Sequence, residues 1–250
     1  MEKATAIIPA RMGSTRFPGK ALAAETGTPM VVHVCQRAAA AESVGQVVVA
    51  TDTDEIADAV VEAGFGAVLT GNHPNGTSRL AEAGELLGLS EDAVIVNVQG
   101  DEPEMAPDLI DAAILALRSG ASVGTVAVPF AQGEDPADPN IVKAVVGVPG
   151  KKNIAPGLLF TRGATPYRRD ESVEVTPLKH VGLYAYSLGS LLGYLSMKPT
   201  PLERAECLEQ LRWLEHGLRI AVAVRECAPV GIDTPEEYAA FVKRWRESAG

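Results

Sequence analysis

The sequence predicts an α/β fold in which a mostly parallel sheet is covered by helices. Two observations predict it. Short apolar runs alternate with helical patterns through the first half of the 250-residue chain, and polar, glycine-containing segments follow those runs, as expected at the carboxyl ends of parallel strands. The second half is less regular and richer in loops, which predicts a smaller lobe inserted into the main domain.

The first half is expected to alternate strictly between strands and helices. Pro29 stands at the start of the first helical pattern, where proline is tolerated because the first amides of a helix need no internal partner. Asp54 lies at the positive end of the second helical pattern and Gly64 just past its other end. The expected strands are residues 4–9, 46–50, 67–70 and 94–98, and the expected helices are 29–41, 53–63 and 78–87. This order indicates a Rossmann-like architecture.

The second half contains fewer periodic segments. Residues 133–140 are rich in aspartate and proline and predict a loop, and residues 148–178 are also loop-rich, with Arg162, Arg168 and Arg169 near Tyr167. The expected strands are 122–128, 141–146, 157–160, 181–187 and 220–224, and the expected helices are 203–216 and 235–245. Because no repeat and no long linker is visible, we expect residues 1–250 to form one domain with an inserted lobe at about 130–215.

The charge of the chain limits its partners. The formal net charge is −10 and the isoelectric point is near 4.9, whereas broad binding to nucleic acids or anionic membranes needs a positive field. An anionic substrate would therefore need a local basic cluster on an acidic body. No apolar run approaches the roughly 20 residues that span a bilayer. We expect neither a nucleic acid nor a membrane as partner.

The cysteines indicate a reducing compartment. Cys35, Cys207 and Cys227 are odd in number and have no C-x-x-C spacing, which argues against a disulfide framework or a zinc knuckle. The N-terminus also lacks a signal-peptide pattern, because Arg11 and Arg16 interrupt it. We expect a soluble, cytoplasmic protein.

The loop after the first expected strand is the strongest functional feature. Residues 11–20 (RMGSTRFPGK) contain three cations, two glycines and two hydroxyls, which together can wrap a polyphosphate. A P-loop does not fit, because Gly13 to Gly19 is one residue too long and Ala21 stands where Ser or Thr would hold the metal. The G-x-G-x-x-G dinucleotide fingerprint is also absent. A solvated loop with incidental basic residues is the remaining alternative.

Two carboxylates are candidate metal ligands. Asp101 follows the fourth strand in a turn constrained by glycine and proline (NVQGDEP, residues 97–103), which suits a hard divalent cation. Its distance from the helix that starts near Pro107 is too long for a cap. Asp233 lies in GIDTPEE (residues 231–237), which is also a good helix N-cap signature. Thr234 can serve as that cap and leave Asp233 free, so the residues alone leave both readings open.

The run from Pro9 to Lys20 resembles the nucleotide loop of sugar nucleotidyltransferases, and more specifically that of the 3-deoxy-manno-octulosonate (Kdo) cytidylyltransferase family, in which PAR-x-x-S-T/S-R-x-PGK is characteristic. The resemblance extends from residue 5 to about 240, with five motifs in the family's order. It implies a nucleotidyltransferase fold of the GT-A-like type. It also implies a homodimer that transfers CMP from CTP to Kdo, with Mg²⁺ as cofactor, for lipopolysaccharide biosynthesis.

The resemblance assigns residues to the nucleotide side of the site. Those implied to bind the nucleotide are Arg11, Ser14, Arg16, Lys20, Arg79 and Gln99. Lys20, Asp101 and Asp233 are implied to be catalytic, with Mg²⁺ on the two aspartates. Arg79 lies in NHPNGTSRL (residues 72–80), which resembles the family's HP-S-GT-D/E-R loop. In this chain Asn75 and Ser78 depart from the usual serine and acidic residue.

The resemblance also assigns an acceptor side. The implied acceptor-binding residues are Arg162, His180, Tyr184, Glu209 and Gln210, of which Arg162 would meet the acceptor carboxylate bidentately. From the residues alone, His180 fits equally a satisfied histidine in a half-exposed strand. Lys143 matches a P-N-x-V-K segment that adds charge near either substrate. The roles of Arg168 and Arg169 stay open, as does the choice between Kdo and a modified analogue such as an 8-amino form.

Two other functions share features with this sequence. A sialic-acid-type cytidylyltransferase shares PAR-x-G-S-K but continues differently, and Phe17 to Lys20 speaks against it. A nucleotide-binding regulator that lost turnover is disfavoured because both candidate metal carboxylates, Asp101 and Asp233, are present.

Overall fold

Strand β1 (Ala4–Ala10) forms from the apolar run that opens the chain, and six of its seven residues are buried. Its neighbours are β2 (Val44–Thr51) on one side and β4 (Val94–Asn97) on the other, and β3 (Gly66–Leu69) pairs with β2. The order is β3-β2-β1-β4, and the strands of all three pairs run parallel to each other. Their carboxyl ends therefore lie at one edge, where ligands of such sheets bind.

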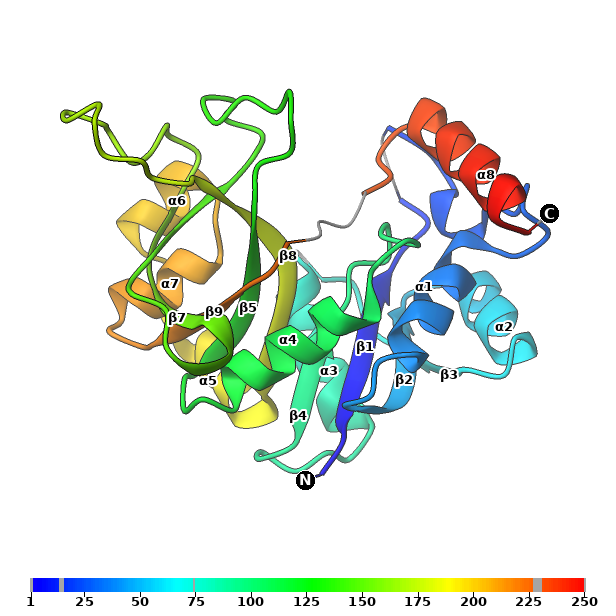
Figure 1. Cartoon of the computed structure of the whole chain (residues 1–250). Helices are drawn as coiled ribbons and strands as arrows, with labels where there is room; N and C mark the ends of the chain where they lie inside the picture. The colour runs from blue at the N-terminus through cyan, green and yellow to red at the C-terminus, as the bar shows by residue number, and fades with distance from the viewer. Residues whose placement is uncertain (1, 14–15, 74, 227–230, 250) are drawn as a thin grey trace. The chain divides into compact units, whose positions relative to one another are not determined.

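The computed structural model describes residues 2–13, 16–73, 75–226 and 231–249. The chain divides into two compact units (Figure 1). The first unit is Met1–Asp111 with Pro229–Gly250, and the second unit is Ala112–Ala228. The predicted lobe at about 130–215 falls within the second unit. That residues 1–250 act as one domain stays a prediction.

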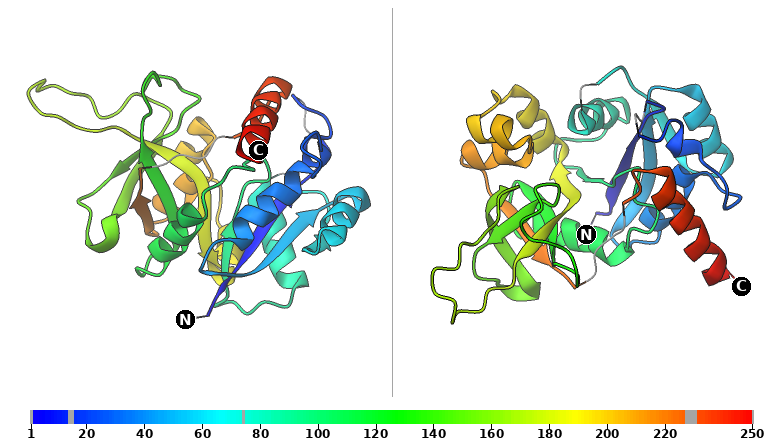
Figure 2. Two further views of the ribbon diagram at one scale, coloured as in Figure 1. Left: turned by 45° about the vertical axis from the view of Figure 1, so that its right-hand side comes forward. Right: turned by 90° about the horizontal axis from the view of Figure 1, so that it is seen from above.

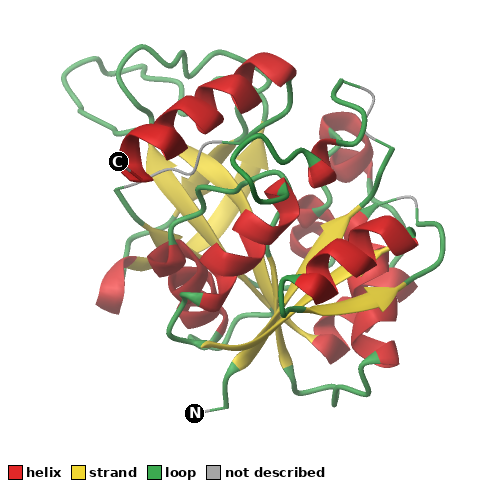
Figure 3. Cartoon of the chain, turned by 90° about the vertical axis from the view of Figure 1, so that its right-hand side faces the viewer, coloured by secondary structure: helices red, strands yellow, loops and turns green. Residues whose placement is uncertain are grey.

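Helices lie on both sides of the first unit's strands (Figure 3). They are α1 (Met30–Ala39), α2 (Asp54–Glu62), α3 (Gly76–Leu86) and the closing α8 (Pro235–Ala249). Pro29 is the residue before α1, and Gly64 has the positive φ of 84° that ends α2, as the sequence predicted. A short 3₁₀ turn at Lys20–Leu22 follows the basic loop.

An apolar cluster joins helix α8 to the segment before it and to the basic loop after β1. The buried members are Met30, Ile232, Tyr238, Phe241 and Val242. Phe17 of the basic loop packs on this cluster, with its ring centroid 5.4 Å from that of Tyr238. The loop after β1 and the segment before α8 are therefore fixed to the same body.

The second unit is built on a mixed sheet of order β8-β5-β9-β7-β6, in which β6 also pairs with β8. Its strands are β5 (Val123–Pro129), β6 (Lys143–Val146), β7 (Ile154–Thr161), β8 (Leu178–Ser187) and β9 (Ile220–Val224). Only β5 and β9 run parallel among the described pairings of this unit, and the others are antiparallel. The chain is thus α/β as predicted, but the mostly parallel arrangement is confined to the first unit.

The predicted helix at 203–216 was wrong as one element. The structure has α6 (Pro201–Glu206) and α7 (Gln210–Glu215). Between them Cys207 adopts a left-handed conformation, with φ 52° and ψ 49°, which no continuous right-handed helix permits. Thr200 and Glu203 form a capping box that starts α6 two residues earlier than predicted.

Other differences concern the less regular half. Helix α5 (Leu188–Ser196) was not predicted, because Gly189 and Gly193 interrupt its periodicity. Helix α4 (Pro107–Leu117) starts where the sequence placed a helix, near Pro107. The segment 162–177 between β7 and β8 extends as a long loop (Figure 2), as expected from its composition. No helix among the described residues has the length and apolarity needed to cross a bilayer.

Candidate active site

A cavity of about 440 Å³ opens at the carboxyl edge of the first unit's sheet, a volume within the range of small-molecule sites. The loops after β1 and β4 and the start of α3 form its walls. Among the residues that line it are the predicted Arg11, Arg16, Lys20, Arg79, Gln99, Asp101 and Asp233. Ser14 lies outside the described residues. The other residues predicted for the nucleotide and the metal are therefore brought to one cavity.

The Lys20 ammonium joins the two candidate metal ligands. Its Nζ donates to Asp101 Oδ2 over 3.0 Å, to Asp233 Oδ1 over 3.3 Å and to the carbonyl oxygen of Ile232 over 2.8 Å. The side chain is only 15% exposed, so these hydrogen bonds are partly shielded from water. Ile232 N–H also donates to the carbonyl of Asp101 over 2.9 Å. The loop after β4 and the segment before α8 are thus held together around one cation.

Asp233 keeps its carboxylate available because another residue caps α8. Glu237 Oε2 accepts hydrogen bonds from the backbone N–H of Asp233 and of Thr234, over 2.7 and 2.9 Å. Thr234 Oγ1 accepts in return from Glu237 N–H over 3.2 Å, which completes a capping box. The hypothesis that Thr234 serves as the cap is confirmed. Arg16 reaches the second oxygen of Asp233 over 2.8 Å, and the Arg16 side chain is exposed while that of Asp233 is about half-exposed.

Asp101 is carried by a turn that packs tightly on β1. A side chain at Gly100 would place its Cβ 2.8 Å from the carbonyl oxygen of Pro9, so only glycine fits. The neighbouring Glu102 turns inward. Burial, and secondarily the charge of Asp101, raise the pKa of Glu102 to about 8. Asp101 is therefore the carboxylate of this turn that faces the cavity.

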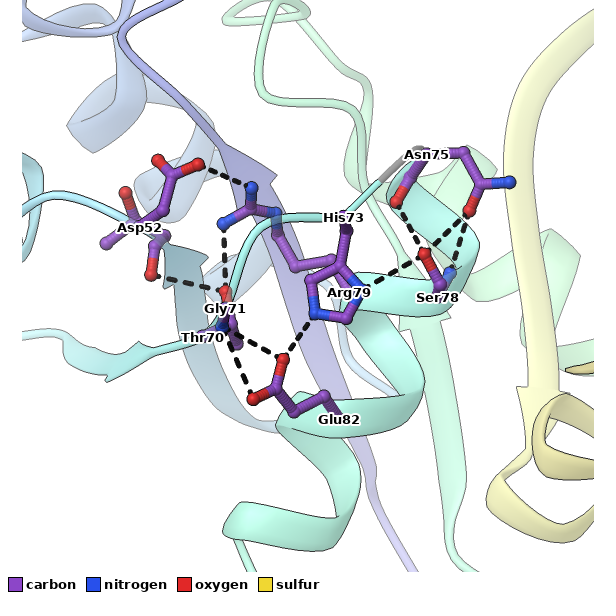
Figure 4. A network of polar contacts seen from close by, with 9 residues as sticks. Asp52, Thr70, Gly71, His73, Asn75, Ser78, Arg79 and Glu82 are labelled. Atoms are coloured by element: carbon purple, nitrogen blue, oxygen red, sulfur yellow. Dashed lines mark hydrogen bonds and ion pairs between the residues drawn. The ribbon is translucent and has the colours of Figure 1, made fainter.

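Arg79 is buried and held by two residues that the sequence analysis missed (Figure 4). One guanidinium nitrogen, Nη1, donates to Thr70 Oγ1 and the other, Nη2, to Asp52 Oδ2, each over 2.8 Å. Asp52 follows β2 and Thr70 follows β3, so both obey the rule that functional residues follow strand ends. That rule was the signal by which Asp52 could have been found.

The loop before α3 accommodates the two departures from the resembled family. Asn75 caps α3, and its side-chain oxygen accepts from Ser78 N–H over 2.9 Å. Ser78 Oγ lies 3.1 Å from His73 Nδ1, and the other ring nitrogen pairs with Glu82. The hydrogen bond from His73, followed by that from Gly71 N–H, lowers the pKa of Glu82. Asn75 and Ser78 are thus hydrogen-bonded to each other.

All five predicted acceptor residues belong to the second unit, and two of them, His180 and Tyr184, lie close together. The rings of His180 and Tyr184 on β8 lie 5.2 Å apart, and His180 Nε2 contacts Thr125 Oγ1 over 2.9 Å. Burial lowers the pKa of His180 to about 3, so its ring is neutral at pH 7. Burial, followed by the charge of Glu209, raises the pKa of the Tyr184 phenol. Gln210 is buried at the start of α7, next to Glu209.

Arg162 is fixed by hydrogen bonds to other residues of the second unit. Its Nε donates to the carbonyl of Glu206 over 2.8 Å and its Nη1 to the carbonyl of Pro139 over 3.0 Å. The Glu206 carboxylate accepts from Thr161 Oγ1 over 2.7 Å and from Arg162 N–H over 2.8 Å. Sequence reasoning missed Glu206, because no local pattern distinguishes it from an exposed helical glutamate.

The Lys143 ammonium is satisfied by backbone carbonyls. Its ammonium is buried and donates to the carbonyls of Asp138, Ile141 and Arg162, over 2.9, 2.8 and 2.6 Å. Burial lowers its pKa. Its contacts fix the loop before β6 against the end of β7. Arg168 is exposed and donates to the carbonyl of Glu171 over 2.6 Å.

The carboxylates that line the cavity are a pair, Asp101 and Asp233. Within the described ranges, no group of three or more His, Cys, Asp or Glu residues is arranged to hold a metal ion. Asp101 and Asp233 approach the same Lys20 nitrogen, so their oxygens converge on one small region. Such a pair suits a cation that also takes ligands from a bound substrate.

Comparisons with known proteins agree with this geometry. A profile of the cytidylyltransferase family matches residues 5–220. A 3-deoxy-manno-octulosonate cytidylyltransferase of Azorhizobium caulinodans is 47% identical over 236 residues, covering 92% of this chain and 90% of that protein. Its counterpart from Yersinia enterocolitica is 44% identical over 241 residues, covering 93% and 94%.

A solved structure extends the comparison to three dimensions. The structure of CMP:2-keto-3-deoxy-manno-octonic acid synthetase complexed with CTP superimposes with a TM-score of 0.89 at 34% identity, covering 98% of this chain and 99% of that one. A match over 98% of the chain includes residues of both units. The chain therefore belongs to the cytidylyltransferase family and, within it, to the 3-deoxy-manno-octulosonate cytidylyltransferases.

Proposed function

We propose that the protein transfers CMP from CTP to the anomeric hydroxyl of Kdo, or of a closely related 2-keto sugar acid, and releases pyrophosphate for lipopolysaccharide biosynthesis. The observation that carries the proposal is the Lys20 ammonium, which joins Asp101 and Asp233 in a cavity also lined by Arg11 and Arg16. Further support comes from the names of the relatives and from the CTP bound by the matched structure.

Transfer to the sugar acid needs little covalent work from the protein. The anomeric oxygen forms a bond to the α-phosphorus, the bond between that phosphorus and the bridging oxygen to the β-phosphate breaks, and the hydroxyl proton leaves to solvent. Arg11, Arg16 and Lys20 would hold the phosphates and offset the charge that builds up on the departing pyrophosphate. Gln99 and Arg79, which line the same cavity, would hold the rest of the nucleotide.

The donor set fits magnesium. Mg²⁺ is commonly held by one or two carboxylates together with substrate phosphates and water, and Asp101 and Asp233 supply two carboxylates around one point. When bound, the ion would neutralise phosphate charge and lower the pKa of the attacking hydroxyl. Lys20 would keep the two acids in place whether or not the ion is bound, because it also donates to the Ile232 carbonyl.

The second unit would supply the acceptor site. Arg162 would meet the acceptor carboxylate, and Glu209 and Gln210 would hydrogen-bond sugar hydroxyls. His180 and Tyr184 would present neutral hydrogen-bonding groups, because their pKa values favour the uncharged ring and the protonated phenol. We further propose a Rossmann-like nucleotide half and a cytoplasmic homodimer, both on the strength of the family.

Pyrophosphate release tests the proposal. The protein is incubated with each of the four nucleoside triphosphates, with Kdo or sialic acid, and with or without magnesium. We expect release only with CTP, Kdo and magnesium together. Release that depends on sialic acid would move the acceptor to the other cytidylyltransferase type. CTP binding without any release would identify a regulator that has lost turnover.

A further inference from the structure

Asn75 stands on the wall of the nucleotide cavity with its side-chain amide held in one orientation. Its oxygen Oδ1 accepts hydrogen bonds from Ser78 N–H over 2.9 Å and from Ser78 Oγ over 3.0 Å. A backbone N–H can only donate, so the amide oxygen must face Ser78. The amide nitrogen Nδ2 must then face the other way, as Figure 4 shows.

A chain of contacts behind Asn75 prevents the amide from turning. Ser78 Oγ also contacts His73 Nδ1 over 3.1 Å and the carbonyl of Asn75 over 3.1 Å. The second nitrogen of His73 pairs with Glu82, which accepts in addition from Gly71 N–H over 3.0 Å. The Asn75 rotamer is thus set before any ligand arrives, which lowers the entropy lost when a ligand binds.

The Nδ2 group has unused donor capacity. It has two N–H bonds, and it meets no acceptor among the described residues. On the same wall, the Arg79 guanidinium already donates to Thr70 and Asp52. The cations suited to phosphates, Arg11 and Lys20, come from a different segment of the cavity lining. A neutral donor on the α3 wall suits the neutral acceptors of a nucleoside, which are carbonyl oxygens, ring nitrogens and sugar oxygens.

We infer that Asn75 is a specificity-determining residue of this cavity and that its Nδ2 donates a hydrogen bond to an acceptor on the nucleoside half of bound CTP. The inference rests on the proposed function, since it takes CTP as the ligand. A site that offers such a donor binds nucleotides with a matching acceptor more tightly than those without one.

The test compares ligands with and without a nucleoside. Isothermal titration in magnesium measures the Kd of CTP and of inorganic tripolyphosphate for the wild type, Asn75→Ser and Asn75→Asp. Serine and aspartate are both good N-caps, so either variant can still start α3. Asn72→Ser is the matched control, because Asn72 is exposed and absent from the cavity lining. Thermal unfolding midpoints report whether each variant is folded.

The expected pattern is specific to the nucleoside. Asn75→Ser raises the Kd of CTP about fivefold, as the loss of one hydrogen bond would, and leaves that of tripolyphosphate unchanged. Asn75→Asp raises the Kd of CTP further, since it replaces the donor by a charged acceptor, and Asn72→Ser changes neither value.

Three results would overturn the inference. The first is CTP binding by Asn75→Ser within twofold of wild type. The second is an equal loss of CTP and tripolyphosphate binding in Asn75→Ser, and the third is wild-type affinity for CTP in Asn75→Asp. Failure of the wild type to bind CTP would instead overturn the proposed function, so the two failures are distinguishable.

Discussion

Lys20 donates to Asp101 over 3.0 Å, and the same ammonium lies 3.3 Å from Asp233. Asp101 follows β4, and Asp233 precedes the C-terminal helix α8, so the lysine joins segments far apart in the sequence. Without a cation between them, two carboxylates that both approach one point would repel one another. Lys20 therefore keeps the pair assembled.

Removing this ammonium should weaken substrate binding and slow turnover. We expect Lys20→Met to lower kcat by about 100-fold or more, since removal of one preorganised donor has effects of that size. Steady-state kinetics with CTP and Kdo measure it. Lys243→Met, on the exposed face of α8, is the control and should behave as wild type. A Lys20→Met enzyme within threefold of wild type would remove Lys20 from the catalytic group.

Magnesium and CTP should stabilise the protein cooperatively. A site that both ligands share couples them, so the rise in Tm caused by CTP should be larger with magnesium than with EDTA. Asp233→Asn and Asp101→Asn should each reduce that difference. Asp58→Asn, on α2 and outside the cavity lining, should leave it unchanged. Undiminished coupling in both cavity variants would place the metal elsewhere.

The capping box of α8 should support Asp233. Glu237→Ala removes the acceptor of two N–H groups, those of Asp233 and Thr234. We expect a loss of about 1 kcal/mol in the free energy of unfolding, typical of a helix cap. Because the segment that carries Asp233 loosens, kcat should fall as well. Glu236→Ala, at the neighbouring position, is the matched control. Urea unfolding measures the free energy of unfolding of both variants, and equal losses in the two would contradict this role of Glu237.

The stability contributed by Glu206 should depend on pH. Hydrogen bonds from Thr161 Oγ and Arg162 N–H lower the pKa of Glu206 below its ordinary value of 4.5. A carboxyl whose pKa is depressed by folding stabilises the protein above its unfolded pKa, and this contribution is lost as the pH falls through its folded pKa. The difference in Tm between wild type and Glu206→Gln should therefore be largest near pH 7 and shrink below about pH 4.5. A difference that grows in acid would have the wrong sign.

The fold of the first unit was predictable because its signals are local. Apolar runs at residues 4–9 and 94–98 became β1 and β4, and the loop that follows each strand carries the residues that line the cavity. The break at Cys207 was not predictable. Its left-handed conformation accompanies contacts of the preceding Glu206 with Thr161 and Arg162, some 45 positions away along the chain.

The candidate site was predictable as a set of residues but not as a network. Arg79 was expected in the cavity, yet its partner Asp52 comes from another loop, and only the parallel sheet brings the two together. The link between His73 and Glu82 depends on how the loop before α3 folds back on that helix. Motifs identify such residues one by one, whereas their pairing is set by tertiary structure.

The product of the reaction tests the central claim most directly. Mass spectrometry of a reaction mixture that contains the protein, CTP, Kdo and magnesium should detect a CMP–Kdo conjugate. The conjugate should form in the same amount as pyrophosphate, and its formation should depend on Asp101. Pyrophosphate accompanied only by free CMP, or no consumption of CTP when Kdo is present, would contradict cytidylyl transfer to the sugar acid.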